Sequence, residues 1–172
     1  MVSYAQNFED VVLNRAFAGK RSGIYIDVGA SHPVTDSVTQ HFYNLGWSGI
    51  NIDPVKGFKE LFDRERTRDV NLECAISDSN GIAEFVDWAG TGSSSFMDIP
   101  GKRSLKGLGY QETQYEVTTR TLASVARDFP LYEVDFLKID VEGAEYRVLS
   151  GNDFSLLRPK VILIEAIRPW LP

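Results

Sequence analysis

The sequence predicts an α/β protein in which helices cover both faces of an open, mainly parallel sheet. Two observations lead to this fold class. Short apolar runs that read as buried strands alternate with segments whose apolar residues recur at the spacing of a helix. The resulting order is β-α-β-α-β, then two consecutive strands, then α-β-α-β. Parallel neighbours need such crossover helices, and 172 residues are enough for one domain of this kind with its buried core.

The first half of the chain opens with a predicted helix over residues 7–17. Asn7 is placed to cap this helix, and Phe8 and Val12 belong to an apolar stripe that is expected to face the core. The elements expected next are a strand at 24–28, a helical stretch within 31–44, a strand at 48–52, a helix that starts at Pro54, and a strand at 71–76.

The second half departs from this alternation between residues 79 and 120. Two strands, 82–88 and 116–120, predict a hairpin inserted after the third strand, with a long loop between them. A loop of that length inside a compact domain is usually functional or disordered, and we expect Ser94 and Ser95 to border a substrate. A helix at 121–129, a strand at 134–139, a helix at 144–149 and a strand at 161–166 complete a single domain that spans residues 1–172, of which 1–20 hold the N-terminal helix.

Composition narrows the possible partners and the compartment. The net charge of −6, from 18 basic and 24 acidic residues, disfavours binding to nucleic acid or to an anionic membrane. Cys74 is the single cysteine, so an intrachain disulfide is impossible, and its place in a predicted strand favours a buried structural thiol. No secretory signal or membrane-spanning apolar run is visible, which predicts a cytoplasmic protein without membrane insertion.

The first candidate site follows the strand 24–28. Asp27 lies at the end of this strand, and Gly29 begins the turn that follows. In open parallel sheets ligands bind at the carboxyl ends of the strands, where a glycine lets them approach the backbone. A carboxylate there repels a pyrophosphate, and the additional glycines of a dinucleotide site are absent. The carboxylate of Asp27 suits the amino group of a sulfonium-bearing amino acid. An equally good interpretation is that Asp27 caps the turn that follows the strand.

Two further positions extend this hypothesis. Asp53 ends the next strand, 26 residues after Asp27, where an acid commonly binds ribose hydroxyls. It is also placed to cap the following helix, and the two roles are compatible. Ser77 and Asp78 close the third strand, where small residues leave room for an adenine ring. On local evidence a plain Ser-Asp turn is at least as good an interpretation.

A group of acids marks the end of the strand 134–139. Asp140 and Glu142 follow this apolar strand, and Glu165 lies in the last one. Acids in such positions are costly to bury unless they have partners, so they are often functional. Asp140 and Glu142 are candidates for activating a substrate hydroxyl. Magnesium binding at Asp140 and Glu165 is possible but not expected, and Glu145 is more easily explained as a salt-bridged residue on a helix face.

The two histidines receive different interpretations. His32 follows the turn at Gly29 and is a candidate base, whereas His41 lies in a predicted helix and is expected to be structural. No cluster of cysteines and histidines points to zinc. We therefore predict no metal site.

Several stretches resemble the FkbM family of methyltransferases. They are YIDVGA at 25–30, GINIDP at 49–54, TRTL at 119–122 and LKIDVEGAE at 137–145, the last being the most specific. The opening SYAQNFED at 3–10 is similar to bacterial members found with polysaccharide-building enzymes. The resemblance covers nearly the whole chain. It implies a Rossmann-like class I methyltransferase sheet and O-methylation with S-adenosylmethionine.

The resemblance also implies roles for individual residues. The methionine end of the cofactor would lie at Asp27, Gly29 and Ala30, and the ribose at Asp53. The remaining roles fall to Ser77 with Asp78 for the adenine and to Asp140 with Glu142 for the reacting centre.

Two departures from the family pattern stand out. Ser31, His32 and Pro33 replace the usual glycine-rich turn, so Ser31 joins the predicted cofactor-binding residues. The family fold also continues with a helix and two strands after its fifth strand, whereas this sequence ends at Pro172. This predicts either a fragment that lacks the C-terminal strands or a sheet that another chain completes.

Three functions follow from these observations. The first is methyl transfer to a hydroxyl, expected on a sugar of a glycan or glycolipid precursor. The alternatives are a non-catalytic cofactor-binding or interaction module of the same fold, and an NAD-dependent oxidoreductase. The sequence does not define the oligomeric state.

Overall fold

The computed structural model describes residues 1–99, 108–131 and 133–165. Its central sheet has five strands in the order β3-β2-β1-β8-β9, and every neighbouring pair is parallel. The mainly parallel sheet of the prediction is therefore confirmed. The strands are β1 (Ile24–Val28), β2 (Ser48–Asp53), β3 (Val70–Glu73), β8 (Phe136–Ile139) and β9 (Val161–Ile164).

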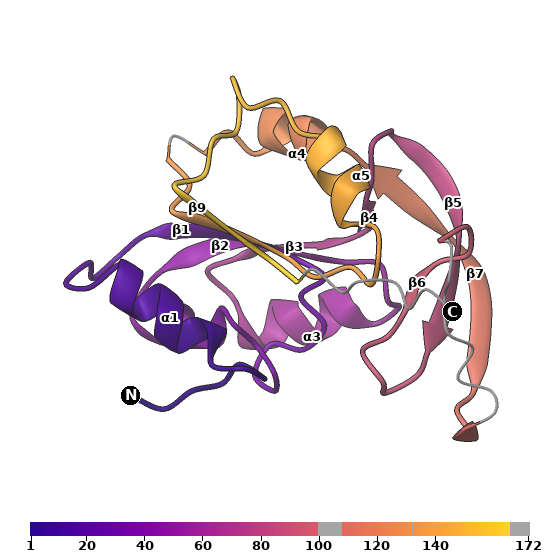
Figure 1. Ribbon diagram of the computed structural model, residues 1–172, viewed down its shortest axis with the longest axis horizontal. Helices are drawn as coiled ribbons and strands as arrows, with labels where there is room; N and C mark the ends of the chain where they lie inside the picture. The colour runs from indigo at the N-terminus through magenta and orange to yellow at the C-terminus, as the bar shows by residue number, and fades with distance from the viewer. Residues whose placement is uncertain (100–107, 132, 166–172) are drawn as a thin grey trace, which may run out of the picture.

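Helices lie on both faces of this sheet, as predicted. Figure 1 shows α1 (Glu9–Ala16) and α3 (Phe58–Glu65) on one side and α4 (Leu122–Asp128) and α5 (Glu145–Ser150) on the other. The short helix α2 (Gln40–Asn44) packs with α1 in one apolar core. None of the helices in the described ranges combines the length and apolar character needed to cross a bilayer.

The alternation of side chains along β1 connects the sheet to a separate core on each face. Tyr25 packs against the side of α1 and α2, whereas Ile26 and Val28 pack against the side of α4 and α5. The chain moves outward from β1 to β2 and β3 and later returns to the other side of β1 as β8. Such a reversal of strand order opens a crevice at the carboxyl ends of the two strands that flank it.

The predicted hairpin forms part of a second sheet, with strand order β4-β7-β5-β6. Strands β5 (Gly81–Trp88) and β7 (Glu112–Arg120) pair antiparallel along their length, and β6 (Ser95–Phe96) adds to the edge of β5. This sheet also receives β4 (Ala75–Ile76), which pairs with β7.

The third predicted strand is thus divided between the two sheets. Residues 70–73 pair with β2, and residues 75–76 leave to pair with β7. Cys74 lies between them with 5% of its surface exposed, and burial raises the pKa of its thiol to about 11. A thiol that stays protonated at neutral pH is a structural residue and not a nucleophile.

The start of α1 differs from the prediction. No side chain caps this helix, and Phe8, at the cap position, has a left-handed backbone with φ 63°. Asn7 instead donates hydrogen bonds from its backbone and its side chain to the carboxylate of Glu9, at 2.9 and 3.1 Å. The predicted Asn7 cap is therefore wrong.

The buried face of α1 also differs from the prediction. Val12 is 62% exposed, whereas Asp10 and Leu13 are almost completely buried. The carboxylate of Asp10 accepts hydrogen bonds from the Ser3 hydroxyl at 2.7 Å and the Tyr4 backbone at 2.8 Å. These bonds satisfy the buried charge and turn the neighbouring Leu13 toward the core.

The helix that was expected to start at Pro54 begins instead at Phe58, after Gly57 with φ 84°. The backbone N–H of Val55 donates to the Asp53 carboxylate, so the first residues after β2 form a turn. Similarly, only residues 40–44 of the stretch 31–44 are helical.

Some predictions fall on residues outside the described ranges. They concern the loop residues 100–107 and residue 166, the last of the predicted strand 161–166. The expectation about the C-terminal strands also stays a prediction, because residues 166–172 lie outside those ranges.

Candidate active site at the carboxyl ends of the parallel strands

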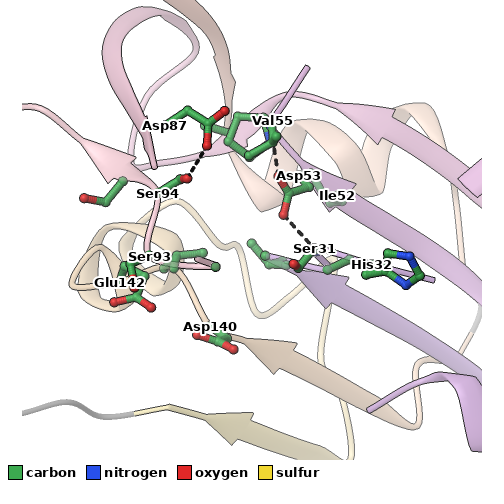
Figure 2. A pocket seen from close by; sticks show the side chains of 18 of the residues that line it. Ser31, His32, Ile52, Asp53, Val55, Asp87, Ser93, Ser94, Asp140 and Glu142 are labelled. Carbon is green, nitrogen blue, oxygen red and sulfur yellow. Dashed lines mark hydrogen bonds between the residues drawn. The ribbon is translucent and has the colours of Figure 1, made fainter. Parts of the chain in front are cut away.

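A cavity of about 600 Å³ lies at the carboxyl ends of β1, β2 and β8, facing the chain between β5 and β6. It brings together most of the residues that the sequence analysis selected (Figure 2). Those that line it are Gly29, Ala30, Ser31, His32, Asp53, Asp140, Glu142 and Glu165.

Asp53 connects two turns at one wall of this cavity. Its carboxylate accepts hydrogen bonds from the backbone of Ser31 and of Val55, each at 2.9 Å (Figure 2). The side chain is buried, and burial raises its pKa to about 6 even though both backbone donors favour the charged form. A carboxylate offers about four acceptor positions, so two bonds leave it able to accept further hydroxyl donors from a ligand.

Asp27 lies behind the cavity wall. Only 1% of the residue is exposed, and it is not among the residues that line the cavity. Its Oδ2 accepts a hydrogen bond from the Thr39 hydroxyl at 3.0 Å. Its Oδ1 lies 3.3 Å from the ammonium nitrogen of Lys138, as an ion pair without an aligned hydrogen bond. The structure thus places Asp53 but not Asp27 against the space for a ligand.

Lys138 joins the ends of β1 and β8. Its ammonium group donates to the carbonyl oxygen of Gly29 at 2.6 Å and lies 3.3 Å from Oδ2 of Asp140. Burial alone would lower the pKa of Lys138, but the charges of Asp27 and Asp140 outweigh it and raise the pKa. The lysine therefore stays charged, and its attraction for both carboxylates stabilises the junction of the two strands.

Gly29 is required by the close approach of these two strands. It has φ 75°, and a Cβ atom placed on it would lie 1.7 Å from the carbonyl oxygen of Asp140. The sequence predicts that this glycine serves the approach of a ligand. The neighbouring chain is a sufficient reason by itself, although Gly29 also lines the cavity.

Three carboxylates converge beside Lys138. Oxygen atoms of Asp140, Glu142 and Glu165 all lie within 4.8 Å of one another. A hydrogen bond shared with Asp140, partial burial and the charges of Asp140 and Glu142 raise the pKa of Glu165 to about 8. Burial and the charges of Asp140 and Glu145 raise the pKa of Glu142. Such a cluster can accept a proton from a hydroxyl near neutral pH, and its oxygens could also bind a hard divalent cation.

The backbone at Glu142 supports a functional role for this cluster. Glu142 has φ 55°, a left-handed conformation that is uncommon outside glycine, and Gly143 follows with φ 102°. Strained residues of this kind concentrate at active sites.

The predicted salt bridge of Glu145 is wrong, because its carboxylate accepts the backbone N–H of Gly143 at 3.0 Å and Arg147 pairs instead with Asp98.

The opposite wall of the cavity comes from the chain between β5 and β6. Ser93, Ser94 and Ser95 line it together with Asp87, and the Ser94 hydroxyl donates to Asp87 at 2.6 Å (Figure 2). The expectation that Ser94 and Ser95 border a substrate stays a prediction, although both are in position to do so.

Ser77 and Asp78 do not line the cavity. Asp78 is exposed, and the Ser77 hydroxyl donates to it at 3.3 Å. The residues just before them, Cys74, Ala75 and Ile76, lie in the cavity wall. The predicted contact of Ser77 and Asp78 with an adenine ring stays a prediction. Of this stretch, the three preceding residues are the ones that line the cavity.

His32 lines the cavity, but its ring has a local role. Its Nδ1 accepts hydrogen bonds from the backbone of Val34 at 3.1 Å and of Thr35 at 3.0 Å. In Figure 2 the ring points away from the carboxylates of Asp140 and Glu142. This arrangement favours a carboxylate over His32 as the base.

Sequence reasoning missed several residues of the wall. Gln6, from the segment before α1, and Asp36, from the loop after β1, both line the cavity, and so does Asp87 of β5. Asp36 belongs to no apolar strand or recognisable pattern. Gln6 lies in the opening stretch 3–10 that resembles family members, but nothing in that stretch assigns Gln6 to a site. Both residues reach the site through tertiary packing.

Comparison with known proteins gives two findings. A family model described as the methyltransferase FkbM domain matches residues 27–171. A curated relative, the 2-O-methyltransferase NoeI of Sinorhizobium fredii, is 32% identical over 101 residues, which cover 55% of this chain and 42% of the relative. The match thus spans less than half of that relative's length. No solved structure matches the chain significantly.

Proposed function

The chain belongs to the FkbM methyltransferase family, and we propose that it transfers a methyl group from S-adenosylmethionine to a hydroxyl of a sugar in a glycan or glycolipid precursor in the cytoplasm. One observation carries this proposal. The cavity at the reversal of strand order contains both a buried carboxylate at the tip of β2, Asp53, and an acid cluster at the end of β8. This is the combination that a nucleoside cofactor and an acid–base reaction need.

The charges of the cavity support a cationic cofactor. Asp53, Asp140 and Glu142 line it, whereas the ammonium group of Lys138 is buried and already bonded to Gly29. When bound, S-adenosylmethionine supplies an electrophilic methyl group on a positively charged sulfur. Its ammonium and sulfonium charges suit an acidic cavity, whereas the pyrophosphate of NAD would be repelled. This difference disfavours the oxidoreductase alternative.

In this proposal, different residues of the cavity wall bind different parts of the cofactor. Asp53 accepts hydrogen bonds from the ribose hydroxyls with the acceptor positions that its backbone donors leave free. Gly29, Ala30 and Ser31 hold the methionine end. Small residues at the start of β4, such as Ala75, leave room for the adenine. Asp27 does not contact the cofactor and contributes indirectly, through its ion pair with Lys138.

The acid cluster supplies the base. The reaction forms an oxygen–carbon bond and breaks a carbon–sulfur bond, so the protein must align the hydroxyl and receive its proton. Asp140 or Glu142 takes this proton, and Glu165 shares it through its hydrogen bond with Asp140. No metal is needed for this step. The name of the relative NoeI, a 2-O-methyltransferase, supports a hydroxyl acceptor.

Calorimetric titration with S-adenosylmethionine, S-adenosylhomocysteine and NAD tests the cofactor. We expect both sulfur compounds to bind and NAD not to bind. Asp53→Ala should weaken binding about tenfold or more, since a hydrogen bond to a charged group contributes roughly 1.5–3 kcal/mol. Asp63→Ala, at an exposed position of α3, is the control. Binding of NAD alone would overturn the proposal.

Transfer itself is tested by mass spectrometry of the surface polysaccharide from cells with and without the gene. Loss of one methyl group per repeat is the expected result. Unchanged methylation in cells that carry Asp140→Asn together with Glu142→Gln would favour the non-catalytic module.

A further inference from the structure

A second cavity of about 300 Å³ lies beside the first, on the side of α1. The two cavities have part of their lining in common, so they meet at one wall. The shared residues are Gln6, Asp36, Lys138, Asp140 and Glu165. Two members of the acid cluster therefore face both spaces. A molecule in the second cavity would reach the same carboxylates as a molecule in the first.

The lining of the second cavity combines polar edges with an apolar base. Gln6 and Asn7 come from the segment before α1 and Glu9 from its first turn, whereas Val38, Leu163 and Ile164 supply apolar surface. Hydroxyl groups pair with carboxylates and amides, and the C–H face of a sugar ring packs on apolar side chains. The cavity thus has the chemistry of a site for a polyhydroxylated molecule.

The polar groups of the N-terminal segment are partly available to a ligand. The Glu9 carboxylate accepts both hydrogen bonds from Asn7 and so fixes the shape of this segment. The carboxamide of Gln6 forms no hydrogen bond to any other residue in the ranges that the structure covers, and Gln6 is exposed. It remains free to donate to a ligand and to accept from one.

The wall of the second cavity is predominantly negative. Glu9, Asp36 and Asp140 line it, and among the described residues of the wall Lys138 is the one cation, with its ammonium group buried and bonded to Gly29. A phosphate or carboxylate on the ligand would meet like charge and find no free cation. The wall therefore favours a neutral molecule over an anionic one.

We propose, on the basis of the function proposed above, that the second cavity binds the acceptor and selects an uncharged polyhydroxylated molecule with its reacting hydroxyl at Asp140 and Glu165. The segment that contains Gln6, Asn7 and Glu9 forms one side of this acceptor site. It lies outside the residues 27–171 that match the family model. One side of the acceptor site is accordingly supplied by a part of the chain that precedes the family's matched region.

Saturation-transfer NMR on the whole chain tests this assignment. The probes are methyl α-D-glucopyranoside, methyl α-L-fucopyranoside and the methyl glycoside of glucuronic acid, each recorded with and without S-adenosylhomocysteine. We expect saturation transfer to the neutral glycosides. The glucuronide should bind at least about tenfold more weakly than they do, because its carboxylate meets like charge in the cavity. Gln6→Ala should reduce binding of the neutral glycosides severalfold. Its calorimetric affinity for S-adenosylhomocysteine should change less than its affinity for the glycosides, because Gln6 lines both cavities but takes part in none of the cofactor contacts proposed above.

Gln114→Ala is the matched control, since Gln114 is exposed and lines neither cavity. It should leave glycoside binding unchanged. Equal binding of the glucuronide, loss of glycoside binding in Gln114→Ala but not in Gln6→Ala, or no saturation transfer to any glycoside while S-adenosylhomocysteine binds would each overturn the acceptor assignment and leave the proposed function standing. Failure of S-adenosylhomocysteine to bind the wild-type chain would instead contradict the proposed function.

Discussion

The ammonium nitrogen of Lys138 lies 3.3 Å from Oδ1 of Asp27, and both side chains are buried beneath the candidate active site. Each charge would be costly to bury alone, so each depends on the other. The pair also joins two strands, because Asp27 belongs to β1 and Lys138 to β8. The wall of the cavity therefore depends on an ion pair in which Lys138 lines the cavity and Asp27 lies behind it.

Replacement of Lys138 by methionine should be strongly destabilising. Lys138→Met leaves Asp27 buried without its cation, and loss of one partner of a buried pair costs roughly 3–5 kcal/mol of unfolding free energy. The double variant Asp27→Asn with Lys138→Met removes both charges and should recover much of this loss. Urea unfolding of the three proteins measures the difference. Equal destabilisation of the single and double variants would show that the charge of Asp27 is not the cause.

Gly29 and Gly19 provide a matched pair for a second prediction. Both have a left-handed backbone, with φ 75° and 83°. A Cβ on Gly29 would overlap the carbonyl of Asp140, whereas a Cβ on Gly19 would meet nothing within 4 Å. Gly19→Ala should therefore cost only about 1–2 kcal/mol for its conformation. Gly29→Ala should cost about 3 kcal/mol or more beyond that, because a packed backbone must move.

Thermal or urea unfolding of the two alanine variants distinguishes these effects. Comparable losses at both positions would mean that the end of β8 gives way easily. In that case the tight contact between Gly29 and Asp140 would not constrain the site.

The sequence was sufficient to predict the elements that alternate regularly. Buried strands such as β1 and β8 are short, mainly apolar runs, and Asp53 stands out because it ends the buried strand β2. Parallel pairing follows from the crossover helices between the strands. For these reasons the sheet, the hairpin and the position of Asp53 at a strand end can be predicted from the sequence alone.

Other features depend on residues that are distant in the sequence. Asp27 looked like a ligand-binding residue because its partner, Lys138, lies on a strand much later in the chain. The helix α1 turned another face to the core because Asp10 finds hydrogen-bond donors in Ser3 and Tyr4. Gln6 lies in the opening stretch that resembles family members, but no local pattern marks it as a residue of the site. Periodicity cannot reveal such contacts, since they arise only when the elements pack.

A third prediction concerns Arg66, which is completely buried. Its guanidinium donates to the carbonyl of Pro33, to the Tyr25 hydroxyl at 3.2 Å and to the Ser37 hydroxyl at 3.0 Å. It also lies 3.8 Å from the Asp69 carboxylate. Arg66→Lys keeps the charge but cannot make these divergent bonds, so buried acceptors lose their donors. We expect a loss of roughly 2–4 kcal/mol in unfolding free energy.

Arg68 is the control for Arg66, because it is exposed and donates only to the backbone of Tyr43 among the described residues. Arg68→Lys should change stability by less than about 0.5 kcal/mol. The loop that Arg66 holds includes Asp36 of the cavity wall, so Arg66→Lys should also weaken ligand binding. A folded Arg66→Lys protein with wild-type stability would contradict the role given to this network.

The last prediction follows from the carboxyl groups of Asp140 and Glu165. A hydrogen bond shared with Asp140, partial burial and neighbouring negative charges raise the pKa of Glu165 from 4.5 to about 8 in the folded protein. Between these two pH values the folded protein holds a proton that the unfolded chain has released. The stability contributed by this group is therefore fully present at low pH and is lost as the pH rises toward 8.

Glu165→Gln imitates the protonated side chain at every pH, so its stability lacks this dependence. The melting temperature of Glu165→Gln relative to wild type should rise as the pH is raised from about 4.5 to 8. Added salt should reduce the difference, because exposed charges are screened. A difference that is independent of pH, or that grows toward acid pH, would mean that Asp140 and Glu165 do not share a proton. The proposal that the acid cluster accepts a proton from a substrate hydroxyl would then have no support.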